Sequence, residues 1–312
     1  MFEIKRYTPQ EKTAWDQYVS KARNATFLFY RDYMDYHSDR FHDYSLMFYK
    51  NGRLYSLLPA HSSGDTLYSH FGLTYGGLLM DISVTAVEIC HLLEELNNYL
   101  RLKGFHHVLY KAIPWIYHQV PSEEDLYALF WKCGAKLSTR NIGTTIFIQQ
   151  HLKWRRNHLR QLKKARLNGV SVQRQADIAE FWPVLEKHLW QRYQSKPVHT
   201  LAEMQLLQSR FPKNIIQYNA YKDGHIIGGV TVYLSRQVVH AQYSSGNDEG
   251  MALGAMEIIY DKIMHEDYPD YVYLDLGSST EQGCCIINEG LIGFKEGYGG
   301  RAVVYDTYEW DL

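Results

Sequence analysis

The chain has 312 residues, of which 46% are hydrophobic and 21% charged, with a formal net charge of −1 at pH 7. This balance excludes disordered and fibrous classes, and the length favours two domains over one. The first ten residues, MFEIKRYTPQ, hold no apolar signal segment, and no apolar run approaches membrane-spanning length. We therefore expect a cytoplasmic protein without a membrane span. The histidines show no metal-ligand spacing, so no metal site is expected.

The near-neutral net charge hides an asymmetry along the chain. Residues 126–176 contain eleven Lys and Arg and no Asp or Glu, whereas residues 248–312 contain fourteen acids against Lys262, Lys295 and Arg301. The middle of the chain can therefore attract anions, while the C-terminal part mostly cannot. Lys295 and Arg301 stand out as cations in an acidic neighbourhood.

The first half of the chain predicts alternating strands and helices. The Asn51-Gly52 pair between two apolar runs is a strong signal for a hairpin. In chain order we expect a strand at 2–7, an amphipathic helix with Pro9 in its first turn, the hairpin at 44–60, a strand within 66–77, a long helix at 83–103, a strand at 106–113, a helix at 122–134 and a strand at 144–149.

The second half repeats this order. KDGH at 222–225 matches KNGR at 50–53 and predicts a second hairpin that turns at Asp223-Gly224. The expected elements are a strand at 170–175, helices around 177–193 and 201–210, the hairpin at 215–234, a strand at 238–245, a helix at 251–265, a strand at 271–276, a short helix within 281–290 and a closing strand pair around 294–300.

The repeated order predicts a tandem duplication. The predicted fold class is α/β (α+β), with each copy forming a mixed, mostly antiparallel sheet flanked by helices. We place the first domain at 1–150 and the second at 151–312, with a basic linker helix over 151–168.

The element order resembles the GNAT acyltransferase fold. Two such units joined by a basic helix resemble the Fem-type peptidoglycan-bridge aminoacyltransferases, without the coiled-coil arm that some members carry. The sharpest similarities are RRNHLRQLKKARLNGV at 155–170 and GLIGFKEGYGG at 290–300, the latter similar to the family's C-terminal FKxGFGG signature. The resemblance implies that the fourth and fifth strands of a unit splay apart to hold an acyl donor.

Lys295 is the main catalytic candidate. The resemblance implies that this lysine lies at the reaction centre, where it can stabilise the oxyanion that forms when an amine attacks an acyl carbonyl. The alternative is a salt bridge to Glu296 or Asp275 on a solvated face. The proton is accepted either by the substrate or by a side chain, for which Glu281 is the candidate.

The glycines around Lys295 predict turns rather than a phosphate-binding loop. Neither GxxxxGK[ST] nor a GxGxxG motif that opens a helix is present. We expect Gly293 to cap a helix, and Gly297, Gly299 and Gly300 to form a bulge or turn with positive φ between strands.

The donor-binding candidates lie around the expected gap between strands. CoA-dependent GNAT enzymes carry [QR]-x-x-G-x-[GA], and the nearest match here is NDEGMA, which keeps the spacing but inserts Asp248 and Glu249. These acids would repel a phosphate, and ordinary helix capping is the alternative. The candidates are Tyr243, Ser244, Ser245, Asn247, Gly250, Ala252, Ser278 and Ser279.

Three cations are candidates for acceptor or phosphate binding. Arg192 ends a predicted helix, while Arg160 and Lys164 lie on the basic linker helix. They can grip a nucleotide-linked acceptor or a charged tRNA, or they can form a solvated helix face. The first copy carries no donor motif, so we expect it to bind the acceptor or to act as a scaffold.

Two functions of different classes follow. The first is an acyltransferase that moves an acyl or aminoacyl group directly to a small-molecule or peptide amine. We expect no tightly bound cofactor, acyl-CoA or aminoacyl-tRNA as co-substrate, and no binding to DNA. The second is a catalytically idle tandem-GNAT protein that recognises an anionic ligand.

Overall fold

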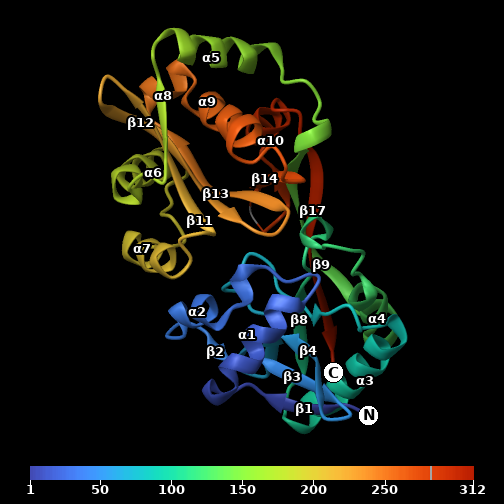
Figure 1. Ribbon diagram of the computed structural model, residues 1–312. Coiled ribbons are helices and arrows are strands. Elements are labelled where there is room, and N and C mark those ends of the chain that lie inside the picture. The colour runs from blue at the N-terminus through green and yellow to red at the C-terminus, as the bar shows by residue number, and fades with distance from the viewer. Residues whose placement is uncertain (282) are drawn as a thin grey trace. The chain divides into compact units, whose positions relative to one another are not determined.

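The computed structural model describes residues 1–281 and 283–312. The chain forms two compact α/β units (Figure 1). The first unit comprises chiefly Met1–Asn141 and Val304–Leu312, and the second chiefly Ile142–Glu281 and Cys285–Val303. Across the described residues, no helix is long and apolar enough to cross a membrane.

The sheets of the first unit are mixed and mostly antiparallel. Strands β6 and β8 pair in parallel, whereas β1–β3, β3–β4, β4–β7, β2–β5, β5–β6 and β8–β17 pair antiparallel. The strands of this unit follow the orders β1-β3-β4-β7 and β17-β8-β6-β5-β2. The elements are β1 (Glu3–Arg6), α1 (Lys12–Lys21), α2 (Arg31–Met34), β2 (His42–Asp43), β3 (Leu46–Lys50), β4 (Arg53–Leu58), β5 (His61–Ser63), β6 (Thr66–Tyr68), β7 (Leu79–Met80), α3 (Ala86–Leu102), β8 (His107–Lys111) and α4 (Glu124–Cys133).

The second unit has the strand order β10-β11-β12-β13-β14-β9-β17. Strands β9 (Lys136–Phe147) and β17 (Arg301–Asp311) contribute residues to both units. The other elements are α5 (Arg156–Leu167), β10 (Ser171–Arg174), α6 (Ile178–Tyr193), α7 (Leu201–Arg210), β11 (Ile215–Lys222), β12 (His225–Leu234), β13 (Val238–Gly246), α8 (Asp248–Leu253), α9 (Ala255–Lys262), a π-helix (Ile263–Asp267), β14 (Tyr273–Ser278), β15 (Thr280–Glu281), β16 (Ile286–Ile287) and α10 (Glu289–Glu296).

Both predicted hairpins are confirmed. Asn51-Gly52 joins β3 to β4 with φ values of 50° and 74°, and Asp223-Gly224 joins β11 to β12 with φ values of 47° and 82°. Two successive positive φ angles give a turn whose twist matches that of the flanking strands, which is why Asn-Gly and Asp-Gly specify hairpins. The predicted fold class is likewise confirmed: each unit holds a mixed sheet with helices packed on it (Figure 1).

Helices cover the sheet of the second unit on both faces. Helices α6 and α7 lie on one face, and α5, α8 and α9 lie on the other (Figure 1). The basic helix α5 is held by Leu162 and Ala165, which are buried in the same core cluster as Ile259 and Tyr260 of α9. Its Arg and Lys side chains therefore remain on the outer face.

Strands β13 and β14 separate soon after they meet. They pair in parallel through three residue pairs only, from Val238↔Tyr273 to His240↔Asp275. Beyond that point β13 stays with β12 up to Gly246, while β14 follows β9. The two strands thus leave a gap at their C-terminal ends.

The structure corrects the predicted elements around Lys295. The short helix expected within 281–290 is α10, which runs from Glu289 to Glu296, and a single strand, β17, replaces the expected closing pair. Lys295 is therefore helical. Asn288 starts this helix, because its side chain accepts a hydrogen bond from the Leu291 amide at 2.9 Å. Gln282, which falls in the predicted helix, lies outside the described residues.

The expected glycine conformations are only partly correct. Gly293 lies inside α10, and Gly297 ends the helix with a φ of −60°. Gly299 has a positive φ of 89°. The predicted long helix at 251–265 is divided into α8 and α9 by Gly254, whose φ is 79°.

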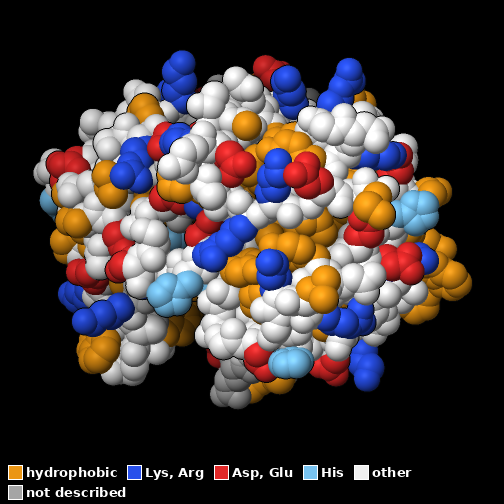
Figure 2. Space-filling model, turned by 90° about the horizontal axis from the view of Figure 1, so that it is seen from below, with side chains coloured by type: hydrophobic (Ala, Val, Ile, Leu, Met, Phe, Trp, Pro, Cys, Tyr) orange, Lys and Arg blue, Asp and Glu red, His pale blue; other side chains and the backbone are white. Residues whose placement is uncertain are grey.

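Acidic and basic side chains alternate on one face of the molecule. Figure 2 shows Lys and Arg interspersed with Asp and Glu around a patch of exposed hydrophobic side chains. This face therefore presents mixed charge rather than a surface of one sign.

Candidate functional site

Three adjoining cavities lie in the second unit at the end of β13. The outer cavity, of about 680 Å³, lies between α6 and the start of α8. The slot, of about 350 Å³, lies beyond the point where β13 and β14 separate and reaches α10. The α5 cavity, of about 410 Å³, lies between α5 and α10. Met251 lines all three, and Glu257 and Phe294 line both the slot and the α5 cavity, so the three form one connected region.

Lys295 is fixed at the gap between the separating strands. Its Nζ donates hydrogen bonds to the carbonyl oxygens of Gly277 at 3.0 Å and Ser278 at 2.7 Å, both at the end of β14. An ammonium group has three N–H donors, so two backbone contacts leave one N–H for a ligand oxygen. Leu291 and Phe294, on the same helix, line the slot.

Burial lowers the pKa of Lys295 to about 8, although nearby Asp275 favours the charged form. Asp275 is fully buried and is held by three groups: His240 Nδ1 at 2.8 Å, the Thr145 hydroxyl at 3.3 Å and the Gly277 amide at 3.0 Å. The Asp275 carboxylate therefore has two effects. It orients the end of β14, whose carbonyls accept hydrogen bonds from Lys295, and it places a negative charge near the Lys295 ammonium.

The alternative salt bridge of Lys295 is not the arrangement found. Glu296 pairs with Arg155 at 3.5 Å, and no ion pair joins Lys295 to a carboxylate within the described part of the chain. The Arg155 guanidinium also donates to the Gly293 carbonyl at 2.9 Å. Helix α10 is thus attached to the residue that precedes α5.

Glu281 lies on the short exposed strand β15 and lines none of the three cavities. Asn288 donates a hydrogen bond to its carboxylate at 2.5 Å. The same Asn288 caps α10, so Glu281 is linked to the start of the helix that carries Lys295. Its role as proton acceptor stays a prediction.

The predicted donor-binding residues fall into two groups. Ser244, Ser245 and Gly250 line the slot, and the buried Ser245 hydroxyl has no hydrogen-bond partner among the described residues. Tyr243 instead points into the packing of α6, where its hydroxyl contacts His199 Nδ1 at 2.6 Å and its ring meets Trp182.

The two remaining serines lie just beyond the lysine contacts on β14. The Ser278 hydroxyl interacts with Thr280 at 2.8 Å. Ser279 is buried, and its hydroxyl has no partner among the described residues. Neither serine lines one of the three cavities.

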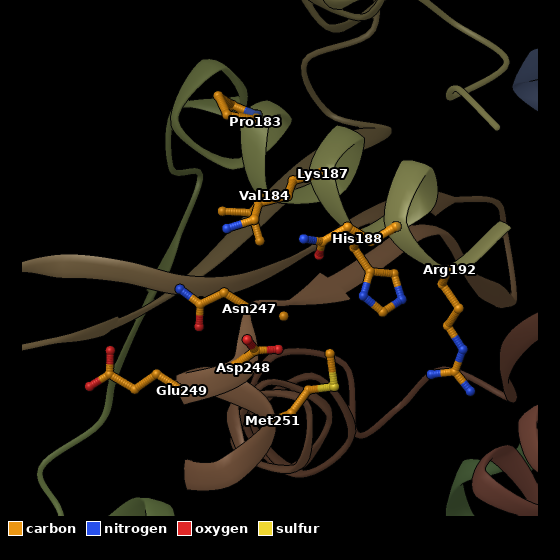
Figure 3. A pocket seen from close by; sticks show the side chains of 11 residues that line it. Pro183, Val184, Lys187, His188, Arg192, Asn247, Asp248, Glu249 and Met251 are labelled. Atoms are coloured by element: carbon orange, nitrogen blue, oxygen red, sulfur yellow. The ribbon is translucent and has the colours of Figure 1, made fainter. Parts of the chain in front are cut away.

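The segment NDEGMA forms the start of α8. The Asn247 side chain accepts from the Gly250 amide at 2.8 Å, so one amide expected to face a phosphate is already used for capping. Glu249 is turned towards His225, at 2.8 Å, and Ala252 offers its carbonyl to Lys164. Figure 3 shows Asp248 and Met251 on the side of the outer cavity that faces α6.

Arg192 lines both the outer cavity and the slot, and Figure 3 shows it reaching down from α6 beside His188. Burial and the neighbouring arginine lower the pKa of His188, whereas Asp248 favours its charged form. The outer cavity is therefore lined by Lys187 and Arg192 on α6 and by two acids, Asp248 and Glu249, on α8.

The two linker-helix candidates differ in their contacts. Arg160 and Lys164 both line the α5 cavity. The Lys164 ammonium donates to the Ala252 carbonyl at 2.7 Å and ties α5 to α8, whereas Arg160 forms no ion pair among the described residues. Arg160 is therefore the better placed of the two to meet a ligand phosphate.

Sequence reasoning missed a buried acid–base pair in this region. Glu257 of α9 contacts His158 of α5 at 2.9 Å, and both side chains are buried. The rings of Tyr298 and Phe294 pack on His158 at 4.2 and 5.2 Å between centroids. The signal in the sequence was an acid within the apolar repeat of α9, but its partner lies 99 positions away.

The comparisons with known proteins identify the fold. FemX matches with a TM-score of 0.69 at 10% identity, covering 99% of this chain and 97% of that one. L-PGS from Bacillus licheniformis matches with 0.63 at 12%, covering 98% and 92%. A tandem GNAT protein from the clavulanic acid biosynthesis pathway matches with 0.54 at 13%, covering 100% and 98%. No protein-family model and no curated protein matches the chain. The chain thus has the tandem GNAT fold that the sequence predicts.

Proposed function

We propose that this protein is an acyltransferase that moves an acyl or aminoacyl group directly from a bound donor to an amine. The observation that carries the proposal is the position of Lys295. Its Nζ is held by the Gly277 and Ser278 carbonyls at the gap between β13 and β14, with one N–H left over. A donor of this kind, aimed at the carbonyl oxygen, stabilises the charge that develops during attack.

Lys295 itself lines none of the three cavities, but Leu291 and Phe294 of the same helix line the slot, which supports a substrate that lies along this helix. The slot combines apolar walls from Met256 and Leu291 with polar groups such as Ser245, which suits an acyl group and its linker. Arg192 at one end and Arg160 at the other suit the phosphates of a nucleotide-linked donor. The fold shared with FemX and the tandem GNAT protein is consistent with this arrangement.

The identity of the donor stays open between acyl-CoA and aminoacyl-tRNA. Asp248 at the outer cavity disfavours a pyrophosphate there, and the Gly250 amide is already used by Asn247. The basic helix α5 favours a larger polyanion. The first unit is proposed to bind the acceptor or to act as a scaffold.

The second candidate is a binding protein that does not catalyse transfer. The start of α8 favours this function, because the Asn247 side chain occupies the Gly250 amide. A donor-binding motif that departs from the CoA pattern is expected in a protein that uses no donor. A transfer assay separates the two. The protein is incubated with acetyl-CoA or with alanyl-tRNA and a panel of small and peptide amines, and products are followed by mass spectrometry. Amide formation that Lys295→Met abolishes supports the enzyme; ligand binding without turnover supports the binding protein.

A further inference from the structure

We propose that Glu257 binds a primary ammonium group of the ligand that fills the slot and the α5 cavity, and so determines which ligands the site accepts. The inference deepens the proposed function and rests on it. Glu257 is only 6% exposed, yet it lines both cavities. It is the one carboxylate among the described residues that line either of them.

A buried carboxylate is costly unless a partner compensates its charge. The partner found here is His158, whose Nδ1 lies 2.9 Å from Oε1 of Glu257. A histidine carries charge only when it is protonated. Among the described residues, no Lys or Arg forms an ion pair with Glu257.

Three cations of the α5 region are committed to other groups. Arg155 binds the Gly293 carbonyl, Lys164 binds the Ala252 carbonyl, and Arg166 binds Asp261 at 2.5 Å. None of them neutralises Glu257. Arg160 lines the α5 cavity and Arg192 lines the slot, but neither forms an ion pair with Glu257 among the described residues. A ligand ammonium can therefore supply the cation that this carboxylate lacks.

Aromatic rings complete the site for a cation. Phe294 lines the same two cavities, and its ring lies 5.2 Å from that of Tyr298 and 5.2 Å from that of His158. The face of an aromatic ring attracts an ammonium group, so Phe294 and Glu257 can hold it together. Phe294 directly precedes Lys295 on α10, whereas Lys295 itself lines neither of the two cavities.

The ammonium group has two chemical sources in the proposed reaction. It is either the α-ammonium of an aminoacyl donor or the amine of the acceptor before it attacks. Both present the same –NH₃⁺ group, and an acetyl donor presents none. Acetylation of the amine removes the charge in either case, which gives one chemical change for testing both sources.

Calorimetric titration of the full chain tests the proposal with two probe pairs. The donor probe is a non-hydrolysable alanyl-nucleotide, in which an amide replaces the ester, against its N-acetylated form. The acceptor probe is N-acetyl-lysinamide, whose one amine lies on the side chain, against its diacetylated form. Hydrogen bonds to charged groups are strong. In one of the two probe pairs we therefore expect the free amine to bind about 10- to 100-fold more tightly than its acetylated form.

Variants assign this preference to Glu257. Glu257→Gln keeps a hydrogen-bond acceptor for His158 but removes the charge, and thermal unfolding checks its fold. If that variant does not fold, Met251→Lys serves instead: Met251 is 46% exposed, and a lysine there supplies a competing cation beside Glu257. The controls are Ile286→Lys, which adds a lysine at a residue that is 45% exposed and lines none of the three cavities, and Glu266→Gln, at an exposed acid of the π-helix.

The preference should fall below about threefold in Glu257→Gln and Met251→Lys and persist in both controls. If the variants lose the preference in the alanyl pair, Glu257 binds the ammonium of the donor. If they lose it in the lysine pair, Glu257 binds the ammonium of the acceptor. Three results overturn the proposal. The wild type binds both members of each pair equally, no probe binds at all, or folded Glu257→Gln keeps the preference unchanged. Transfer without an amine preference refutes this inference alone, whereas an amine preference without transfer from any donor refutes the proposed function alone.

Discussion

The ring of His158 occupies the space in which a side chain at Gly297 would lie. A Cβ at Gly297 would come within 2.5 Å of Cδ2 of His158. The C-terminal end of α10 therefore packs directly on the imidazole that contacts Glu257. Gly297 of the FKEGYGG segment is therefore required for packing. Its φ of −60° is one that any residue can adopt, so backbone conformation does not require a glycine here.

Gly297→Ala is expected to destabilise the second unit by about 1–3 kcal/mol, because the added methyl group overpacks a fixed ring. Chemical denaturation measures the loss. Gly293→Ala is the matched control: it lies in the same helix, and the nearest atom to its Cβ is Nη1 of Arg155 at 3.8 Å. That variant should be neutral or stabilised by up to about 1 kcal/mol, since alanine favours helix. Equal effects in both variants would contradict the packing role.

Lys295→Met should reduce the rate of transfer by about 100- to 1000-fold and leave donor affinity nearly unchanged, because the lysine acts on charge that develops during attack. Lys164→Met should leave the chemical step intact and cost about 1 kcal/mol of stability, since it removes the hydrogen bond to the Ala252 carbonyl. Steady-state kinetics and thermal unfolding of both variants check this. The same kinetic loss in the two variants would exclude a specific role for Lys295.

The rate should fall as the pH rises through about 8. Burial lowers the pKa of Lys295 to about 8, and an oxyanion donor must be protonated. The charged fraction is therefore high below that pH and declines above it. Initial rates measured from about pH 6 to about pH 10 test the direction. A rate that instead rises between about pH 7 and about 9, as deprotonation of the acceptor amine alone would produce, would contradict Lys295 as a protonated oxyanion donor.

The same shift has a consequence for stability. The folded chain holds the pKa of Lys295 at about 8, below the ordinary lysine value of 10.5, so between these two pH values the unfolded chain binds more protons. The contribution of Lys295 to stability therefore increases with pH in that window. Lys295→Met should remove this slope, which thermal unfolding at several pH values detects. A slope that survives the substitution must come from another group.

Asp248→Asn and Glu249→Gln should affect CoA binding differently if acyl-CoA occupies the outer cavity. Asp248 faces α6 across that cavity, so its neutralisation should tighten binding a few-fold after solvent screening (Figure 3). Glu249 is paired with His225, so its change should leave affinity the same. Calorimetry with CoA compares the two. No heat of binding in the wild type or in either variant would remove acyl-CoA as donor.

The hairpins were predictable because their signals are local. Asn51-Gly52 and Asp223-Gly224 need only their own backbone preferences to turn. Helix α10 was placed too early in the sequence, because its glycines argue against a helix. It forms because Asn288 caps it and because Phe294 packs on His158, which is a tertiary contact.

In the candidate site, too, local signals were predictable from the sequence and tertiary contacts were not. Lys295 was found through a similar motif, whereas its partners, the carbonyls of Gly277 and Ser278, are backbone groups that no side-chain pattern reveals. Glu257 was missed because an acid on a helix is ordinary in sequence. Only the fold brings His158 beside it and opens the slot in front of it.

Strand β17 has a consequence for the order in which the protein is made. Its residues Val304–Leu312 belong to the first unit, where Trp310 is buried in the core and donates to Asn97 at 3.0 Å. The ribosome therefore completes the second unit before it supplies the residues that finish the first. The first unit therefore stays incomplete, with an open sheet edge beside β8, until the residues up to Leu312 have been synthesised.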